Sequence, residues 1–348
     1  MKKQIIISVI AAILFLAGLA AMLFLNTFRL DLPSADTTLP FYTANPGTSA
    51  PPVTQPPTQP PTDPPTEPPT TAPPPTTVPP PDTWDPEDIG LEAEYAFVYS
   101  TARGRVLYEG GDQQAHVAPA SITKLLTAYV ALQYLELDQV ITVGNEITLI
   151  DPFSSVANIL YGHRLTTEML IQGLLMQSGN DAAYTLAVAA GRAIAGNNNL
   201  SIDSALSTFM KKMNETAKEL GMQNTRFLTP DGNDKSGHYT TMEDLLILSQ
   251  VTMDNPIIMR YCGMAEANVT FVSGQTRKWT NSNYLLSTKH GFYTAACIGL
   301  KTGTTSKAGK CLISAFDEGD DILIIGVLSC PTDDGRYEDT LYLYEKYR

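Results

Sequence analysis

Three short polar motifs hold the residues of this sequence that could act together as a nucleophile and its proton carriers. The first is Ser121-Ile122-Thr123-Lys124, which follows Pro119 and opens an apolar-periodic run that continues to Leu135. Residues three apart share one face of a helix, so the Ser121 hydroxyl and the Lys124 amine point into the same space. A lysine kept neutral by burial can take the proton of a serine hydroxyl and make it a nucleophile. Alone, the pair is also typical of an amphipathic helix with a capping serine and a solvated lysine.

The second and third motifs lie far along the chain. Ser178-Gly179-Asn180 is predicted to lie on a loop between two helices, where both polar side chains can turn into one cleft. Lys301-Thr302-Gly303 is predicted on an edge strand, where a substrate backbone can approach the glycine closely. Each also fits a plainer interpretation, an inter-helix turn with a capping residue or a hairpin with a solvated lysine. The three motifs together, one at a helix start, one on an inter-helix loop and one on a strand, are unlikely to arise by chance.

The elements that must position these motifs are strands at both ends of the globular part and helices between them. Hydrophobic periodicity predicts a hairpin over 93–109, helices from Ser121 and over 162–179, 181–195, 204–220 and 241–253, strands over 298–304, 310–316 and 321–329, and a last helix over 334–347. Strands that bracket helices most simply form one antiparallel sheet. We therefore expect an α/β protein of the α+β type, with an antiparallel sheet flanked by helices and an all-helical lobe.

The first 89 residues are predicted to stand apart from this globular part, which we place at residues 90–348. Residues 1–29 resemble a transmembrane anchor: two lysines precede the uncharged run 5–25, which spans about 31 Å as a helix. A cleaved signal peptide is the alternative, although the apolar run continues past the small residues at 18–20. Residues 30–89 are predicted to be a disordered linker, because 18 of the 25 prolines lie between Pro46 and Pro86. Either way, we expect an extracytoplasmic catalytic domain, held at the cell membrane or secreted.

Composition excludes some functions. The formal net charge of −13 argues against a nucleic-acid partner, because phosphate contacts need clustered Lys and Arg. Four histidines and four cysteines are scattered without metal-ligand spacing, so we expect neither a metal site nor a cofactor. The predicted strand register places no cysteine opposite another, so buried free thiols are expected despite export.

The three motifs together resemble those of the penicillin-binding and serine β-lactamase superfamily. Over residues 90–348 the sequence is similar to the low-molecular-mass penicillin-binding proteins that are serine D-alanyl-D-alanine carboxypeptidases. Further similar segments are Thr229-Pro230-Asp231-Gly232 with 237–241, and Arg336 before the last helix. The resemblance implies a DD-peptidase-like fold, peptidoglycan stem peptides as substrate and β-lactams as inhibitors, with no metal or cofactor. Many members of the family carry a second, β-rich domain after the catalytic one. Because this sequence stops at Arg348 with its last predicted helix, we expect that domain to be absent and the N-terminal anchor and linker to replace its function.

The resemblance also implies roles for individual residues. Ser121 would attack the carbonyl between the two terminal D-alanines, and Lys124 would take its proton. Ser178 would relay a proton to the leaving D-alanine, Asn180 would hold Lys124 and the substrate amide, and Lys301 would lend positive potential to the cleft.

The remaining implied roles concern substrate binding. Thr302, and Arg336 with it, would bind the terminal carboxylate beside Gly303. Backbone N–H groups of Ser121 and Thr304 would form the oxyanion hole.

Three other functions stay open. A class A β-lactamase should carry Glu-x-x-Leu-Asn before the Lys-Thr-Gly strand, and no such segment lies between Asn180 and Lys301. A transpeptidase differs only in passing the acyl group to an amine. An inactive wall-binding module on the same fold would have no need of all five polar side chains.

Overall fold

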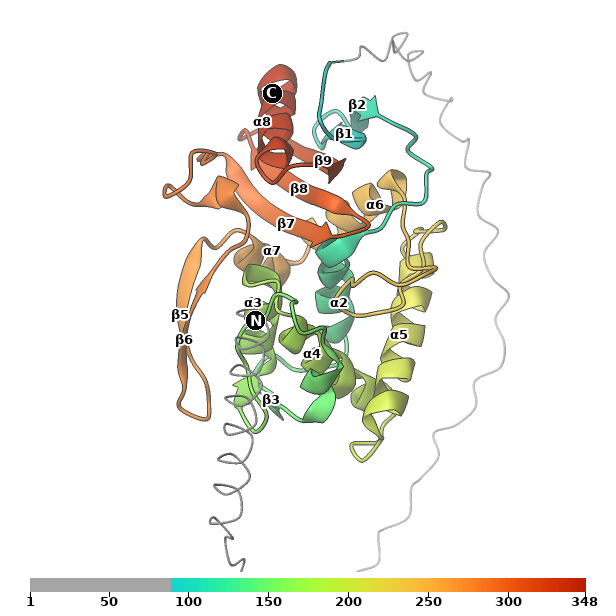
Figure 1. Ribbon diagram of the computed structural model, residues 1–348, viewed down its shortest axis with the longest axis vertical. Helices are drawn as coiled ribbons and strands as arrows, with labels where there is room; N and C mark the ends of the chain where they lie inside the picture. The colour runs from blue at the N-terminus through green and yellow to red at the C-terminus, as the bar shows by residue number, and fades with distance from the viewer. Residues whose placement is uncertain (1–88) are drawn as a thin grey trace, which may run out of the picture. The chain divides into compact units, whose positions relative to one another are not determined.

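A five-stranded antiparallel sheet joins the two ends of the globular part (Figure 1). The computed structural model describes residues 89–348. The strand order is β2-β1-β9-β8-β7, and the strands are β1 (Tyr95–Ser100), β2 (Arg105–Gly110), β7 (Cys297–Thr305), β8 (Gly309–Asp317) and β9 (Ile322–Cys330). β1 pairs with β9, as the bracketing strands predict, and β7 forms one edge.

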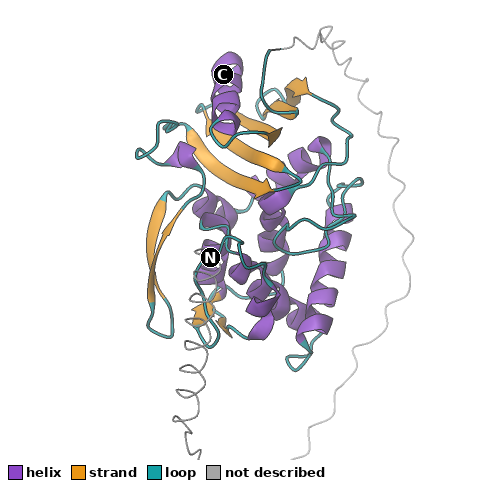
Figure 2. Cartoon of the chain, in the orientation of Figure 1, coloured by secondary structure: helices purple, strands orange, loops and turns teal. Residues whose placement is uncertain are grey.

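The sheet is the middle layer of the fold because both of its faces are apolar. Successive side chains of a strand point to opposite faces. On β1, Ala96 and Val98 belong to the cluster with α8 (Gly335–Tyr347), while Phe97 belongs to the larger cluster shared with the other helices. Figure 2 shows α8 on one side of the sheet and the remaining helices on the other. The sheet therefore separates two hydrophobic cores.

The helical lobe is built around α2 (Thr123–Ala131), whose side chains are almost all buried. α2 packs against α3, α4, α5 and α6. The lobe's other helices are α3 (Thr167–Met176), α4 (Asn180–Ile194), α5 (Ile202–Glu219), α6 (Met242–Met253) and α7 (Pro256–Cys262). Short 3-10 turns are η1 (Ala120–Ile122), η2 (Asn145–Leu149) and η3 (Tyr284–Leu286). The predicted helices are all present, with shifted ends.

The expectation of an all-helical lobe is wrong. Two small sheets accompany the helices: β3 (Val140–Thr142) with β4 (Arg164–Thr166), and β5 (Glu266–Thr270) with β6 (Thr276–Thr280). Each strand buries a single side chain, such as Val269 in β5 and Trp279 in β6, and one buried position gives no visible periodicity.

The helix predicted from residue 162 begins only at Thr167. The side chain of Thr166 accepts a hydrogen bond from Met169 N, which caps the helix there and leaves the preceding residues free to form β4.

The four cysteines are buried and free, as expected. The sheet register differs by one residue from the predicted one, because Cys297 lies opposite Phe316, and Leu312 rather than Cys311 lies opposite Val327. Neither difference puts one cysteine opposite another.

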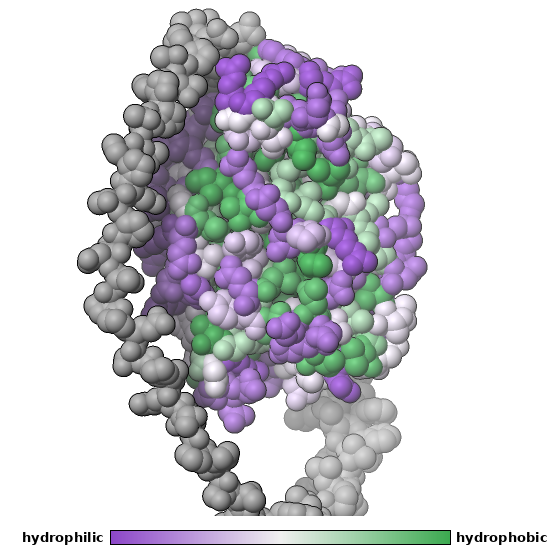
Figure 3. Space-filling view, turned by 180° about the vertical axis from the view of Figure 1, so that it is seen from behind, coloured by the Kyte–Doolittle hydropathy of each residue, from purple (hydrophilic) through white to green (hydrophobic). Residues whose placement is uncertain are grey.

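The surface seen in Figure 3 alternates between hydrophilic and apolar patches, with no single apolar band across that face. The predicted anchor and linker lie outside residues 89–348, apart from Ile89 at the linker's end. Within 89–348, no helix combines the length and apolar character needed to cross a bilayer.

Candidate active site

Ser121 and Lys124 meet where η1 runs into α2. Lys124 Nζ donates a hydrogen bond to Ser121 Oγ at 2.7 Å and another to the main-chain oxygen of Asp231 at 2.7 Å. Ser121 stays partly exposed, whereas Lys124 is fully buried. The predicted helix start is a 3-10 turn, and it brings the two side chains together as the spacing predicts.

Burial makes Lys124 able to act as a base. Loss of hydration lowers the pKa of its amine to about 8, although the carboxylates of Asp231 and Asp181 oppose that shift. A neutral amine is therefore available near neutral pH, one hydrogen bond away from the hydroxyl that it would deprotonate.

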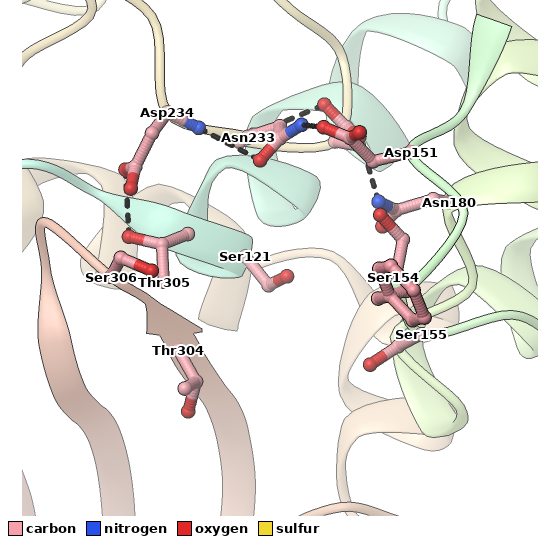
Figure 4. A pocket seen from close by; sticks show the side chains of 13 residues that line it. Ser121, Asp151, Ser154, Ser155, Asn180, Asn233, Asp234, Thr304, Thr305 and Ser306 are labelled. Carbon is pink, nitrogen blue, oxygen red and sulfur yellow. Dashed lines mark hydrogen bonds between the residues drawn. The ribbon is translucent and has the colours of Figure 1, made fainter. Parts of the chain in front are cut away.

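Ser121 opens onto a cavity of about 390 Å³. In Figure 4 it lies between Thr304, at the end of β7, and Asn180, at the start of α4. The other lining residues are polar apart from Phe153 and Gly232: Asp151, Phe153, Ser154, Ser155, Asp231, Gly232, Asn233, Asp234, Thr305 and Ser306. The cavity thus lies between the sheet edge and the helical lobe.

The Ser-Gly-Asn motif forms one wall, but only part of it reaches the cavity. Asn180 lines the cavity and donates from Nδ2 to Asp231 Oδ2 at 2.8 Å. Ser178 is buried and is not among the residues that line the cavity. The next residue, Asp181, accepts hydrogen bonds from Ala157 N and Ile159 N, and this fixes the neighbouring loop.

Strand β7 forms the opposite wall. Lys301 is buried and donates from Nζ to Thr302 O at 3.1 Å. Burial lowers the pKa of Lys301 well below its usual value, and the positive charges of Lys124 and Arg336 lower it further. An incoming carboxylate would favour the charged form of this amine, because opposite charges stabilise each other in a desolvated site.

Gly303 lets this wall approach the nucleophile. A Cβ atom at Gly303 would lie 3.0 Å from the Cβ of Ala120, the residue before Ser121. The hydroxyl oxygen of its neighbour Thr302 lies 2.5 Å from the hydroxyl oxygen of Ser282, at hydrogen-bond distance. Sequence analysis did not find Ser282, because nothing in its local pattern indicates a contact with a strand twenty residues away.

Arg336 comes from α8 and lies beside β7. Its Nη1 donates to Gly303 O and to Thr304 Oγ1, each at 3.2 Å, and its Nη2 pairs with Asp333 at 2.6 Å. The structure places Arg336 against the predicted binding strand but not among the residues that line the cavity. Across residues 89–348, no group of three or more His, Cys, Asp or Glu side chains is placed to hold a metal ion.

The fold is that of the DD-peptidases. Structures of the Streptomyces K15 DD-transpeptidase match with a TM-score of 0.66 at 27% identity, covering 73% of this chain and 96% of that one. Penicillin-binding protein D2 from Listeria monocytogenes, in its ampicillin-bound form, matches with a TM-score of 0.60 at 30% identity, covering 74% and 98%.

Sequence comparison assigns the chain to a narrower class, a single family of DD-peptidases. Residues 82–332 match the D-alanyl-D-alanine carboxypeptidase family model, and the chain belongs to that family. D-alanyl-D-alanine carboxypeptidase DacC of Escherichia coli is 32% identical over 248 residues, which are 69% of this chain and 57% of that protein. DacF of Bacillus subtilis is 27% identical over 236 residues, 67% and 56% of the two chains. The chain thus spans less than two thirds of the length of these relatives.

Proposed function

We propose that this protein is a serine D-Ala-D-Ala carboxypeptidase that removes the terminal D-alanine from peptidoglycan stem pentapeptides. The observation that carries the proposal is the 2.7 Å hydrogen bond from a fully buried Lys124 to Ser121, at the mouth of a polar cavity. Family membership supports the reaction class, and the geometry supports Ser121 as the nucleophile and Lys124 as its base.

In the proposed reaction, Ser121 Oγ attacks the carbonyl carbon between the two D-alanines while Lys124 takes its proton. The C–N bond breaks, the leaving amine of D-alanine receives a proton through Lys124 and Ser178, and an ester on Ser121 remains. Water then hydrolyses the ester and restores the serine. Thr304, beside Ser121 in the cavity, supports the proposed oxyanion hole, which would use the backbone N–H groups of both residues.

The substrate's terminal carboxylate is proposed to bind along β7. Lys301 and Thr302 are the candidates for this contact, and the Ser282 hydroxyl holds Thr302 in place. Arg336 supports the same strand through Gly303 O and Thr304 Oγ1. A β-lactam carries a carboxylate and a reactive carbonyl and would acylate Ser121 in the same orientation.

The experiment measures D-alanine release from an acyl-Lys-D-Ala-D-Ala tripeptide, alongside gel labelling with a fluorescent penicillin. Wild type should release D-alanine and become labelled, whereas Ser121→Ala should do neither. Ser249→Ala, at a buried serine of α6 that bonds Leu245 O, is the matched control and should remain active. Equal labelling of wild type and Ser121→Ala would overturn the proposal.

Transpeptidation is the second candidate, because a DD-transpeptidase is among the structural matches. It is tested by adding an amine acceptor to the same assay. Formation of a new peptide at the expense of the hydrolysed product would favour it. Rapid penicillin turnover without D-alanine release would instead indicate a β-lactamase, and absence of both reactions would indicate an inactive wall-binding module.

We further propose that residues 1–29 anchor the protein in the cell membrane and that residues 30–89 carry the domain of residues 90–348 outside it. The uncharged run 5–25 and the proline-rich composition support this arrangement. Full-length protein should sediment with membranes and be digested by external protease on intact cells, while deletion of 1–29 should release it into the soluble fraction. A full-length protein that is soluble and protected from external protease would contradict the arrangement.

A further inference from the structure

Asp231 connects the two sides of the candidate site. Its main-chain oxygen accepts a hydrogen bond from Lys124 Nζ at 2.7 Å, and its carboxylate accepts one from Asn180 Nδ2 at 2.8 Å. A third bond, from Asn233 N to Asp231 Oδ1 at 3.1 Å, closes the turn. Asp231 is 2% exposed, so these contacts are shielded from water.

The turn that carries Asp231 is itself fixed to the nucleophile's helix. Thr127 Oγ1, one helical turn after Lys124, donates to Pro230 O at 2.6 Å. Gly232 lies so close to Ala120 that a Cβ atom would be 1.8 Å from Ala120 O. The position of Asp231 is therefore set by contacts with α2 and η1 as well as by its own turn.

On this geometry, which rests on the proposed carboxypeptidase function, we propose that Asp231 is a positioning residue. It holds Lys124 and Asn180 at a fixed separation, and its negative charge sets the pH range in which Ser121 reacts. Its main-chain oxygen orients the Lys124 amine, and its carboxylate orients the Asn180 side-chain amide.

Charged groups face Lys124 from three elements. Asp231 lies in the loop before α6, Asp181 lies on α4, and Lys301 lies on β7. His238 contacts Thr123 rather than Lys124, with 3.5 Å between Nε2 and Oγ1. Asp231 acts most strongly of the two carboxylates that favour a protonated Lys124. Removing its charge should leave the amine easier to deprotonate but a weaker base.

The test compares acylation rates by fluorescent penicillin from pH 5.5 to 9.5 for the full chain. The wild-type rate should rise through a midpoint near pH 8, where Lys124 loses its proton. Asp231→Asn should shift that midpoint down by about one pH unit, so that its rate at pH 7, relative to its own plateau, rises about fivefold. Asp231→Ala should show the same shift with a lower plateau, because Asn180 loses its acceptor.

Asp244→Asn is the control, since Asp244 is a buried carboxylate of α6 that bonds Asn224 N and Thr225 Oγ1 away from the cavity. It should leave the midpoint unchanged. Should Asp231→Asn fail to fold, Asp231→Ser keeps a hydroxyl acceptor without charge and takes its place.

Two results would overturn the inference. An unshifted midpoint in a folded, labelled Asp231 variant would leave the proposed function standing and reduce Asp231 to a packing role. A wild type that is not labelled at any pH would instead refute the proposed function and, with it, this inference.

Discussion

At the residue scale, the site depends on ionisable groups that burial pushes away from their usual charge states. Lys124 and Lys301 are both fully buried, and burial lowers the pKa of both amines. Neither forms a hydrogen bond with a side-chain carboxylate; their hydrogen-bond partners are Ser121 Oγ and two main-chain oxygens. Two such lysines are costly to the fold. Neither lines the cavity, but buried lysines so near a cavity are typical of function rather than of packing.

His238 is a third buried group, behind the nucleophile's helix. Burial lowers its pKa to about 4, and its Nδ1 has no hydrogen-bond partner among residues 89–348. In the unfolded chain the His238 imidazole takes up a proton near pH 6.5, whereas in the folded protein it does so only near pH 4. Between these values, acid should therefore favour unfolding.

His238→Phe tests this through stability. The wild-type free energy of unfolding should lose about 3 kcal/mol relative to the variant as pH falls from 6.5 to 4, and the difference between them should be constant above pH 6.5. Urea titrations at several pH values measure it. Thr123→Val removes the hydroxyl contact with His238 without removing the ring, so the pH-dependent loss should remain. Parallel curves for wild type and His238→Phe would contradict the linkage.

At the scale of elements, a loop, a helix start and a strand edge meet within van der Waals contact. Gly232 of the loop lies against the main-chain oxygen of Ala120 in η1, and Gly303 of β7 lies against the Cβ of Ala120. Side chains at either glycine would push its element away from Ser121. These two glycines therefore set the width of the cavity beside the nucleophile.

Gly232→Ala should be much more damaging than Gly237→Ala. Both glycines have the same left-handed backbone, with φ of +85° and +84°, which costs any other residue about 1–2 kcal/mol. Only Gly232 adds a backbone clash, at 1.8 Å, whereas a Cβ at Gly237 meets nothing closer than 3.8 Å. We expect Gly232→Ala to lower the free energy of unfolding by several kcal/mol and to abolish most penicillin labelling.

Urea unfolding and labelling rates of the two variants check this. Gly237→Ala, the matched control, should lose about 1–2 kcal/mol and retain its labelling rate. Equal losses for both variants would mean that the contact with Ala120 does not constrain the loop.

At the scale of the whole molecule, the candidate site is formed only because the sheet and the helical lobe pack together. Ser121 comes from η1, Lys124 from α2, Asn180 from α4, and Lys301 to Thr304 from the sheet edge. No single layer holds the full set. Unfolding of either the sheet or the helical lobe should therefore abolish the proposed reaction completely.

The cysteines report on the integrity of both layers. All four are buried, and burial raises the pKa of Cys262 and Cys297 to about 12 and that of Cys311 to about 11. Thiolates react with alkylating agents and thiols do not, so the native protein should take up almost no label.

Mass spectrometry after iodoacetamide treatment measures this. Protein unfolded in urea without reductant should gain four labels, because the chain has four free cysteines. Reduction before labelling is the control and should not increase the number. A gain of only two labels without reductant would show a disulfide that the structure does not contain.

The sequence by itself determined the secondary structure around the candidate site residues. Helical periodicity with a three-residue spacing put Ser121 and Lys124 on one face, and terminal strands around central helices indicated one antiparallel sheet. These features depend on residues that are close in sequence, so the periodicity and spacing of side chains are enough to predict them. The anchor and linker were predicted on the same local grounds and stay predictions.

Tertiary structure alone decided which distant residues contact the motif residues and their neighbours. Asp231, Ser282 and Gly232 act on residues that lie 107, 20 and 112 positions away in the chain. Burial of Lys124 comes from every element packed around α2, so neither its lowered pKa nor its second hydrogen bond could be read from its own segment. A long-range contact leaves no period in the sequence, because only packing brings its two partners together.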